Sequence, residues 1–385
     1  MLEWDDVFEA EEKGERIKRA DMCAGIEVFR QNRSLLLIPP DDGFKCISTG
    51  FCNGGFIDSP TGIVNTTSEG GVLEASTMGN PREYHDHCTR LYLNKLGLDP
   101  YRTATLGTAA HMDNAGFCNM TTPDGIDVSV AMTGGIRGNG GRAGDPAMFD
   151  EATADREVRG TIVLMIAVDC NLSDRAMIEL MDVGTEAKSC VIQELQARSL
   201  YSHGIATGSG TDQVAVMCRN RGDTVDTGTG KDGGIGRAVA ECVKHALRET
   251  FDLQSYMVPE TQCDPYVMLS RFGVDEDRIN NEIRFPARMV YLLRAREHVK
   301  RDPYLAAVMS AALHIQDRIE NGMTDAEEGL DLVRELVPNA LPFVKGFSPV
   351  MDVRLEKCDT IPDYLSIVMA LSILNNAKLL EAGLI

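Results

Sequence analysis

The sequence predicts an α+β protein whose core is a mixed or antiparallel sheet with packed helices. One observation is that the expected strands end in glycine-rich turns, and those at 127–132 and 162–168 are joined without a clear crossover helix. A doubly wound parallel sheet would need such a helix. The other observation is that glycines thin out after Phe251 and helical patterns dominate. We therefore expect an α+β domain over 1–250 and a mainly helical C-terminal extension over 251–385.

The composition narrows the possible partners. The chain has 385 residues, 43% of them hydrophobic, so it can bury a sizeable core. Its net charge is −20, from 38 basic and 58 acidic residues. Nucleic acids and anionic membranes bind mainly through lysine and arginine clusters, so neither partner is expected. The longest apolar run, 162–168, is far too short to span a membrane.

Cysteine usage and the first residues indicate the compartment. The 11 cysteines are scattered and form no C-x-x-C pair, which is typical of reduced, mostly buried thiols. The first twenty residues are charged from Glu3 onward, unlike a secretory signal. These features predict a cytoplasmic location.

The N-terminal third is expected to contain strands and one ambiguous polar segment. Residues 1 to about 35 are predicted to form a charged amphipathic helix, followed by a strand at 34–38. The segment His85-Asp86-His87-Cys88 holds side chains that can ligate zinc, but its other ligands would have to come from elsewhere. We therefore interpret it as the solvated start of a helix and predict no metal site.

A glycine-rich loop follows the strand at 127–132. It contains Asn139, Arg142 and Asp145. Ordering so many glycines costs conformational entropy, which favours a functional loop over a structural Arg–Asp pair. Beyond it, 161–168 is a buried strand, and Ser173 is placed to cap a helix that begins at Asp174.

The stretch 204–247 joins two small-residue loops, one strand and a helix. The loop 206–212 precedes a strand at 213–217, and a second glycine cluster at 228–234 opens a helix. The apolar residues of this helix recur at i, i+3, i+4 and i+7, which predicts one buried face. Glycines and the N–H groups at a helix start suit close binding of anions or carbonyl oxygens. The spacing is not that of a nucleotide P-loop, because Asp232 replaces the magnesium-binding hydroxyl.

The extension carries helix signals but no recognisable chemistry. Thr324 to Glu327 reads as a capping box, and 367–380 as an apolar helix. The extension could cover a site, bind a partner or mediate formation of a homo-oligomer.

Five separated elements occur in an order that resembles the adenosylcobinamide amidohydrolase family. They are Asn53-Gly54-Gly55, Thr108-Ala109-Ala110, Asn139 to Pro146, Thr185 to Lys188, and Thr207 to Asp212 with Gly230-Lys231. The resemblance covers roughly residues 34–250. It implies hydrolysis of the amide between the corrin ring and aminopropanol, giving adenosylcobyric acid and 1-amino-2-propanol in corrinoid salvage. A cobalt corrinoid would be the substrate, and no separate cofactor is expected. The family commonly has His where this chain has Asp232.

The resemblance and the residue types together suggest two sets of site residues. Amide hydrolysis needs a nucleophile, donors for the oxyanion and an acid for the leaving amine. The predicted catalytic residues are Thr207, Thr211, Asp212, Lys231 and Glu186. The predicted substrate-binding residues are Asn53, Gly54, Asn114, Asn139, Arg142, Asp145 and Lys188.

Two questions stay open at this point. The nucleophile is either a water activated by a carboxylate or a threonine of the 207–211 loop; no Gly-x-Ser-x-Gly elbow is present. The other functions consistent with the sequence are a corrinoid carrier or sensor without hydrolysis, for which Asp232 would be the sign, and a hydrolase that acts on another amide.

Overall fold

The computed structural model describes residues 14–67, 81–146, 161–283 and 288–385, with only the backbone described for 81–85. The chain divides into two compact units, Met1–Val258 and Pro259–Ile385. The sequence placed this division at 250/251. The helix α4 (Gly234–Ser255) continues through that point, so the first unit ends after Val258.

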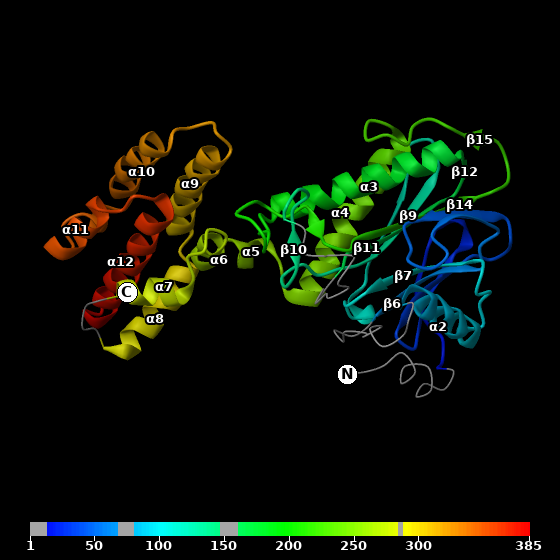
Figure 1. The fold of residues 1–385 in the computed structure, drawn as a ribbon, viewed down its shortest axis with the longest axis horizontal. Coiled ribbons are helices and arrows are strands. Elements are labelled where there is room, and N and C mark those ends of the chain that lie inside the picture. Colours follow the sequence, from blue (N-terminus) through cyan, green and yellow to red (C-terminus); the bar gives the residue numbers. More distant parts are fainter. Residues whose placement is uncertain (1–13, 68–80, 147–160, 284–287) are drawn as a thin grey trace. The chain divides into compact units, whose positions relative to one another are not determined.

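Two sheets form the centre of the first unit (Figure 1). The first sheet contains, in spatial order, β1 (Ile17–Asp21), β2 (Glu27–Gln31), β3 (Ser34–Ile38), β6 (Gly62–Thr67) and β7 (Thr103–Thr108). The second contains β5 (Gly55–Asp58), β4 (Phe44–Ser48), β14 (Gln213–Arg219), β11 (Val163–Val168), β9 (Asp127–Thr133) and β8 (Gly116–Thr121). Short two-residue strands form two further pairs, β10 (Gly140–Gly141) with β13 (Gly208–Ser209) and β12 (Asn171–Leu172) with β15 (Thr224–Val225).

Each of the two large sheets is mixed. In the first sheet β6 and β7 run parallel, and in the second β11 and β14 do; the remaining neighbours within these two sheets are antiparallel. The structure thus confirms the predicted α+β class and mixed sheet. The strands β9 and β11, which the sequence joined without a clear crossover helix, are direct antiparallel neighbours, with Val163 opposite Thr133.

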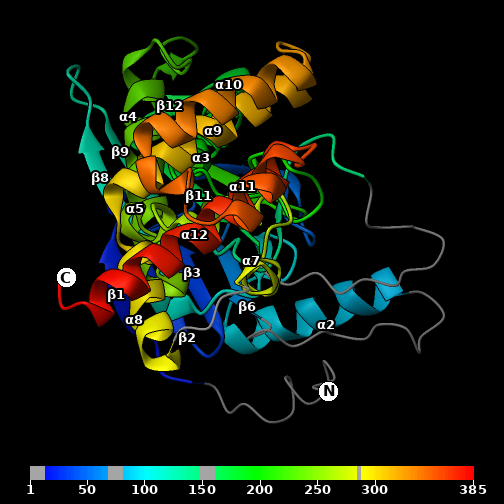
Figure 2. The same cartoon turned by 90° about the vertical axis from the view of Figure 1, so that its left-hand side faces the viewer.

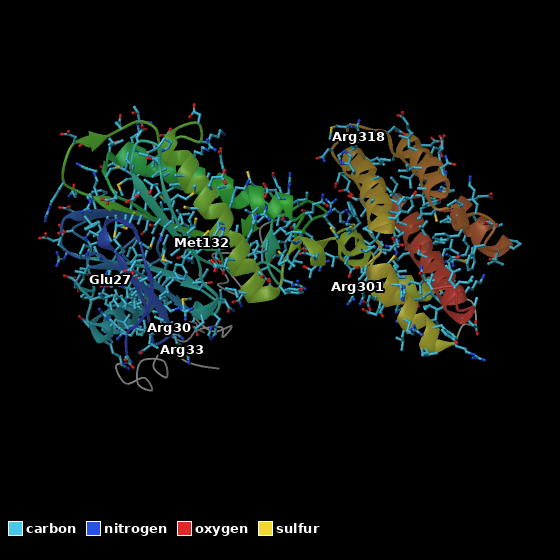
Figure 3. The ribbon with its side chains drawn as sticks, turned by 180° about the vertical axis from the view of Figure 1, so that it is seen from behind. Glu27, Arg30, Arg33, Met132, Arg301 and Arg318 are labelled. Atoms are coloured by element: carbon cyan, nitrogen blue, oxygen red, sulfur yellow. The ribbon has the colours of Figure 1, made fainter. Side chains whose placement is uncertain are left out.

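The two sheets face each other across one apolar core, and helices cover their outer faces. Val163, Met165 and Ala167 of β11 belong to the core between the sheets. The alternating residues of the same strand, and Met132 on β9 (Figure 3), belong to the core beneath α3 (Asp174–Glu194) and α4. A strand buried on both faces reads as a continuous apolar run, which is why 162–168 carries no polar residue.

The helices of this unit follow their sequence signals. Ser173 caps α3, and its Oγ accepts a hydrogen bond from the Ala176 N–H at 3.2 Å. The predicted apolar stripe of α4 is buried throughout, namely Ile235, Ala238, Val239, Cys242, Val243, Ala246 and Leu247. On the opposite side, α2 (Pro81–Leu96) packs against the first sheet (Figure 2). Short 3-10 turns, η1 (Cys23–Gly25) and η2 (Met112–Asn114), complete the unit.

The predicted N-terminal helix is wrong for the part that is described. Residues 17–31 form β1 and β2 instead, and Ile26 and Val28 are completely buried. The link from β2 to β3 is a two-residue turn at Asn32 and Arg33, with Asn32 in the left-handed region at φ 50°. Pairing with β3 buries this segment, and this tertiary gain outweighs its helical pattern.

The second unit is entirely helical in its described residues. Its helices are α5 (Pro259–Gln262), α6 (Pro265–Ser270), α7 (Glu276–Glu282), α8 (Met289–Lys300), α9 (Pro303–Glu320), α10 (Ala326–Ala340), α11 (Pro349–Glu356) and α12 (Ile361–Glu381), with a 3-10 turn η3 (Pro342–Val344). Asp325, not Thr324, caps α10, since its carboxylate accepts from the N–H groups of Glu327 and Glu328.

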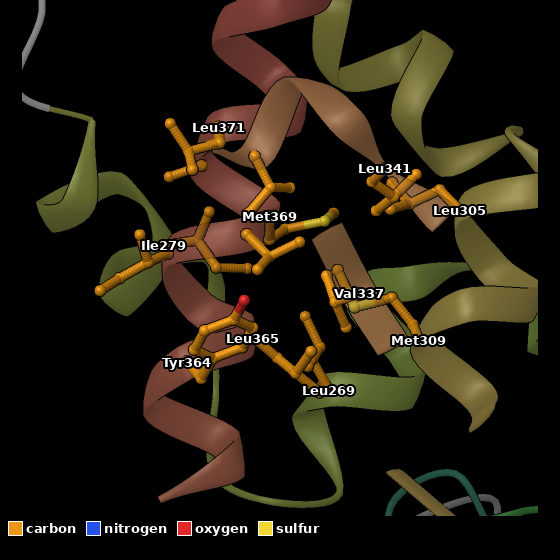
Figure 4. Packing of buried hydrophobic residues seen from close by; sticks show 14 of the residues in the cluster. Leu269, Ile279, Leu305, Met309, Val337, Leu341, Tyr364, Leu365, Met369 and Leu371 are labelled. Carbon is orange, nitrogen blue, oxygen red and sulfur yellow. The ribbon is translucent and has the colours of Figure 1, made fainter. Parts of the chain in front are cut away.

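The central helix of this unit is α12. Leu365 and Met369 are completely buried, and Figure 4 shows them among Leu269, Met309 and Val337. A cavity of 530 Å³ is lined by Arg334, Lys345, Gly346, Asp352, Leu355, Glu356 and Tyr364. Two of its charged side chains are held by the unit itself: the Arg334 guanidinium donates to the Glu356 and Cys358 carbonyls, and Asp352 accepts from the Gly346 N–H.

Candidate active site

One edge of the second sheet gathers the polar residues of several strands. Because β11 and β14 are parallel, both begin at this edge, and the antiparallel strands β9 and β4 end there. The ends of β6 and β7 reach the same place: Asn65 Nδ2 donates to Thr133 Oγ1 at 2.8 Å, and Thr108 Oγ1 donates to the Thr161 carbonyl at 3.2 Å. Residues from both sheets therefore meet at one edge.

A buried ion pair lies at the start of β14. Lys188 of α3 donates to Asp212 Oδ2, and these side chains are only 10% and 17% exposed. Asp212 Oδ1 accepts from the Ile162 N–H at 3.2 Å and from Ser209 N–H and Oγ at 3.0 and 2.6 Å. Both carboxylate oxygens are thus occupied by donors. Asp212 is therefore suited to organise the loop that surrounds it.

Gly208 allows the loop to pass directly over this ion pair. A Cβ at this position would collide with Asp212 Oδ2 and would lie 2.6 Å from Lys188 Nζ. Here the glycine is required by close approach of the backbone and not by an unusual φ. This accounts for one of the glycines that mark the 206–212 loop in the sequence.

Two threonine hydroxyls face each other beside the ion pair. Thr161 Oγ1 and Thr211 Oγ1 are 2.6 Å apart, and Thr161 is only 6% exposed. Thr211 was predicted from the sequence, but Thr161 was missed because it reads as the first residue of a buried strand. The signal that could have identified it is its position: a polar side chain directly before a central strand lies at the sheet edge where the loops meet.

The glycine-rich loop after β9 lies next to the same site. Gly140 and Gly141 pair with Ser209 and Gly208, which brings Asn139 close to the ion-pair loop. Asn139 is only 3% exposed. Asn139 and Arg142 thus flank the two glycines that pair with the 206–212 loop, and the functional interpretation of this loop stays a prediction.

Hydrogen bonds within the loop fix its shape. Asp145 accepts from the Arg142 N–H at 2.7 Å and from Ser199 Oγ, and the Arg142 guanidinium donates to the Ile205 carbonyl at 3.0 Å. Burial alone would raise the pKa of Asp145, but hydrogen bonds from Ser199, Ser202 and the Arg142 N–H outweigh it and hold the pKa below its ordinary value. Thr207 Oγ1 accepts from the Ala143 N–H at 2.9 Å, so this hydroxyl also positions the loop.

Two predicted catalytic residues lie apart from this site. Glu186 and Lys231 pair with each other at 3.1 Å, and their side chains are 56% and 74% exposed. Glu186 and Lys188 are two positions apart on α3, so they point about 200° apart around the helix. The structure therefore brings Lys188 to Asp212 and leaves Glu186 and Lys231 on the surface of the helical layer.

The second glycine cluster, at 228–234, accepts hydrogen bonds from the start of the helix that follows it. The N–H groups of Ile235 and Gly236, at the start of α4, donate to the Gly228 carbonyl at 3.0 and 3.1 Å. These two groups, which the sequence suggested for anion binding, are thus occupied within the loop. Asp232 is exposed in the same loop.

The predicted asparagines near the N-terminus support other loops. Asn53 Nδ2 donates to the carbonyls of Pro100 and Thr103, each at 2.8 Å, and neighbouring Gly54 packs tightly against the Gly50 carbonyl. Thr103 begins β7, whose far end, five residues or about 16 Å away, reaches the site.

Asn114 holds a different part of the unit, since its Nδ2 donates to Gln254 Oε1 at 2.8 Å. Asn53, Gly54 and Asn114 are therefore not brought together with the ion pair.

The described residues contain no cluster of three or more His, Cys, Asp or Glu side chains that could hold a metal ion. On α2, His87 is exposed and Cys88 is buried, whereas the side chain of His85 is outside the described residues. All eleven cysteines are described and carry free thiols. The prediction that no metal is needed stays a prediction.

Comparison with known proteins identifies a matching family. The profile of the family described as adenosylcobinamide amidohydrolase matches residues 19–259, more than half of the chain. An uncharacterized protein of Methanocaldococcus jannaschii is 32% identical over 170 residues, which cover 41% of this chain and 66% of that protein. An adenosylcobinamide amidohydrolase of Halobacterium salinarum is 29% identical over 134 residues, 35% of this chain and 54% of that protein. The chain thus spans between about half and two thirds of these relatives.

Two solved structures show weaker similarity. A protein from Pyrococcus horikoshii OT3 has a TM-score of 0.31 at 11% identity and covers 62% of this chain and 83% of its own. A Burkholderia β-aminopeptidase has a TM-score of 0.30 at 13% identity, with coverages of 65% and 83%. TM-scores of this size do not establish a common fold.

Proposed function

Because this chain belongs to the adenosylcobinamide amidohydrolase family, we propose that it hydrolyses the amide that joins the corrin ring to aminopropanol in adenosylcobinamide. The products are adenosylcobyric acid and 1-amino-2-propanol. The reaction serves corrinoid salvage in the cytoplasm, with the corrinoid as substrate and no separate cofactor. Among the described helices none is both long and apolar enough to cross a membrane.

The observation that carries this proposal is the buried Lys188–Asp212 pair beside the Thr161–Thr211 hydroxyls. Amide hydrolysis adds an oxygen nucleophile to the carbonyl carbon, and negative charge develops on the carbonyl oxygen. A buried ammonium group and fixed N–H donors stabilise such charge far better in a water-poor site than in bulk water. The site thus offers hydroxyls for attack and a cation held in place before the substrate arrives.

Substrate recognition is assigned to the loop after β9. A corrin carries amide side chains around its rim, and these need partners with both donor and acceptor atoms. The Asn139 amide provides both kinds of atom and the Arg142 guanidinium provides donors, on either side of the glycines that pair with the 206–212 loop. Asp145 accepts a hydrogen bond from the Arg142 N–H and so fixes the shape of this loop before the substrate binds. A loop that is already ordered loses less conformational entropy on binding.

The test is to incubate the purified protein with adenosylcobinamide. The mass of the corrinoid product and the amount of released aminopropanol are then measured. We expect adenosylcobyric acid and one aminopropanol per corrinoid. Bound but unchanged cobinamide would point to a carrier or sensor. Neither binding nor turnover would point to a hydrolase of another amide.

Substitutions in the 207–212 loop refine this test. Asp212→Ala leaves a buried ammonium group unpaired and is expected to reduce turnover most. Thr207→Ala is expected to reduce it least, since that hydroxyl only accepts from the Ala143 N–H. Thr211→Ala should fall between them. Wild-type rates in all three variants would exclude this loop as the catalytic centre.

A further inference from the structure

The threonines at the active edge differ in what their hydroxyls do. Several hold the backbone or a neighbouring side chain: Thr49 Oγ1 accepts from the Val214 N–H, Thr108 Oγ1 bonds the Thr161 carbonyl and the Ala110 N–H, Thr133 Oγ1 accepts from Asn65, and Thr207 Oγ1 accepts from the Ala143 N–H. Thr161 Oγ1 and Thr211 Oγ1 form a hydrogen bond with each other. A hydroxyl pair of this kind can pass a proton from one oxygen to the other.

The peptide bond that joins Thr161 to Ile162 is held by two hydrogen bonds. Its carbonyl accepts from Thr108 Oγ1, and the next N–H, that of Ile162, donates to Asp212 Oδ1. The following strand, β11, lies between β9 and β14 in the centre of the sheet. Thr211, in contrast, lies in the turn between β13 and β14. Thr161 lies two residues before β11, at this doubly held peptide bond, and catalysis depends on positioning of this kind.

We infer that Thr161 Oγ1 is the nucleophile of the amide hydrolysis and that Thr211 Oγ1 relays its proton; this inference rests on the function proposed above. Asp212 positions both residues, because it binds the N–H next to Thr161 and is itself the neighbour of Thr211. Lys188 donates to Asp212 Oδ2 and holds this carboxylate in place. The nucleophile therefore lies outside the glycine loop from which the site was first predicted.

The reaction balances in two steps. Thr161 Oγ1 forms a bond to the amide carbon, the carbon–nitrogen bond breaks, and the hydroxyl proton passes through Thr211 to the leaving amine nitrogen. This gives an ester between Thr161 and the corrin side chain together with free aminopropanol. Water then adds to the ester carbon, the carbon–oxygen bond to Thr161 breaks, and the proton returns to Oγ1. The sum is amide plus water to acid plus amine.

A small activated ester tests the nucleophile without a corrinoid. The full-length protein is treated with p-nitrophenyl acetate, and acetylated peptides are mapped by mass spectrometry. We expect a burst of p-nitrophenolate and acetyl on the peptide that contains Thr161. Thr161→Val should abolish both, and Thr161→Ser should retain them. The matched control is Thr61→Ala, which removes another hydroxyl pair, Thr61 with Thr103 at 2.8 Å, and should leave the burst unchanged.

The same variants are then compared with adenosylcobinamide. Thr161→Val should lower turnover at least about 1000-fold while corrinoid binding is kept, and Thr211→Val should lower it about 10- to 100-fold. Acid quenching of the wild-type reaction should trap the corrinoid ester on Thr161. A folded Thr161→Val protein that hydrolyses cobinamide at the wild-type rate would overturn the assignment and leave the proposed function intact. Acetylation of Thr161 in a wild-type protein that does not hydrolyse cobinamide would support the nucleophile and reject that substrate.

Discussion

The two units of the molecule handle buried polar groups in opposite ways. Tyrosine and cysteine aside, the described residues of the first unit bury 19 polar or charged side chains, whereas those of the second bury two. The two in the helical unit, Ser366 and Ser372, donate to carbonyls of their own helix at 2.8 Å. In the first unit the partners come from distant parts of the chain, such as Asn65 with Thr133 and Lys188 with Asp212.

The number of buried polar side chains thus differs between the unit that carries the proposed site and the helical unit. A buried polar group without a partner costs about 1–3 kcal/mol, so each one has to be matched by a partner of suitable geometry. The helical unit largely avoids that cost with an apolar core. The first unit accepts it in several places. One is Ser34 with Tyr92 of α2, and another is the sheet edge where Asn65 meets Thr133 and Lys188 meets Asp212. Buried polar groups joined across the fold therefore distinguish the first unit from the second.

The largest expected effect comes from removing the buried cation. Lys188→Met leaves the Asp212 carboxylate buried without its partner, and we expect the free energy of unfolding to fall by about 3–5 kcal/mol, with loss of cobinamide hydrolysis. Lys231→Met is the matched change in an exposed pair and should cost below about 0.5 kcal/mol with activity kept. Urea unfolding and the hydrolysis assay measure both. Equal losses in the two variants would remove the distinction between the buried and the exposed pair.

A core substitution in the helical unit should affect stability alone. Leu365 of α12 is completely buried, and Leu365→Ala is expected to destabilise its unit by about 2–5 kcal/mol. Because all the proposed site residues lie in the first unit, the hydrolysis rate of the folded variant should not change. Circular dichroism at rising temperature and the assay at low temperature check this. Leu332→Ala, at a position 46% exposed on α10, is the control and should be nearly neutral. A slower reaction in the fully folded Leu365→Ala protein would mean that the helical unit contributes to the site.

The smallest expected effect is on the stability that Asp145 contributes in the loop after β9, and this contribution depends on pH. The pKa of Asp145 is lowered in the folded state, so its stabilisation is present above the ordinary carboxyl pKa of about 4 and is lost as the pH falls through the lowered value. Ser199→Ala removes one donor and should cost less than about 1 kcal/mol at pH 7, with the difference from wild type shrinking toward pH 3. Ser372→Ala in the helical unit should show a difference that does not depend on pH. Denaturant midpoints at pH 7 and pH 3 decide between these outcomes, and a pH-independent Ser199→Ala effect would contradict the role given to Asp145.

Local patterns in the sequence predicted much of the fold. The 3.6-residue period of α4 identified its buried face, and the apolar run 162–168 identified the central strand. These succeed because periodicity records which side of an element is buried, and that information is local. The same reasoning failed at 17–31, where charged residues suggested a helix and pairing with β3 made strands.

The order of five short motifs predicted the family, and the profile match over residues 19–259 confirms it. Which residues meet at the site was decided by the tertiary structure. Lys188 meets Asp212 across 24 positions, and Thr161 meets Thr211 across 50, because β11 and β14 begin at one edge and α3 returns to it. Glu186 and Lys231 carry the same kinds of charge but pair away from this edge. Sequence determined which residue types were available and which elements carried them. Strand order and register decided which ones touch, since a contact between distant segments depends on the placement of whole elements and is not encoded in the spacing of either segment.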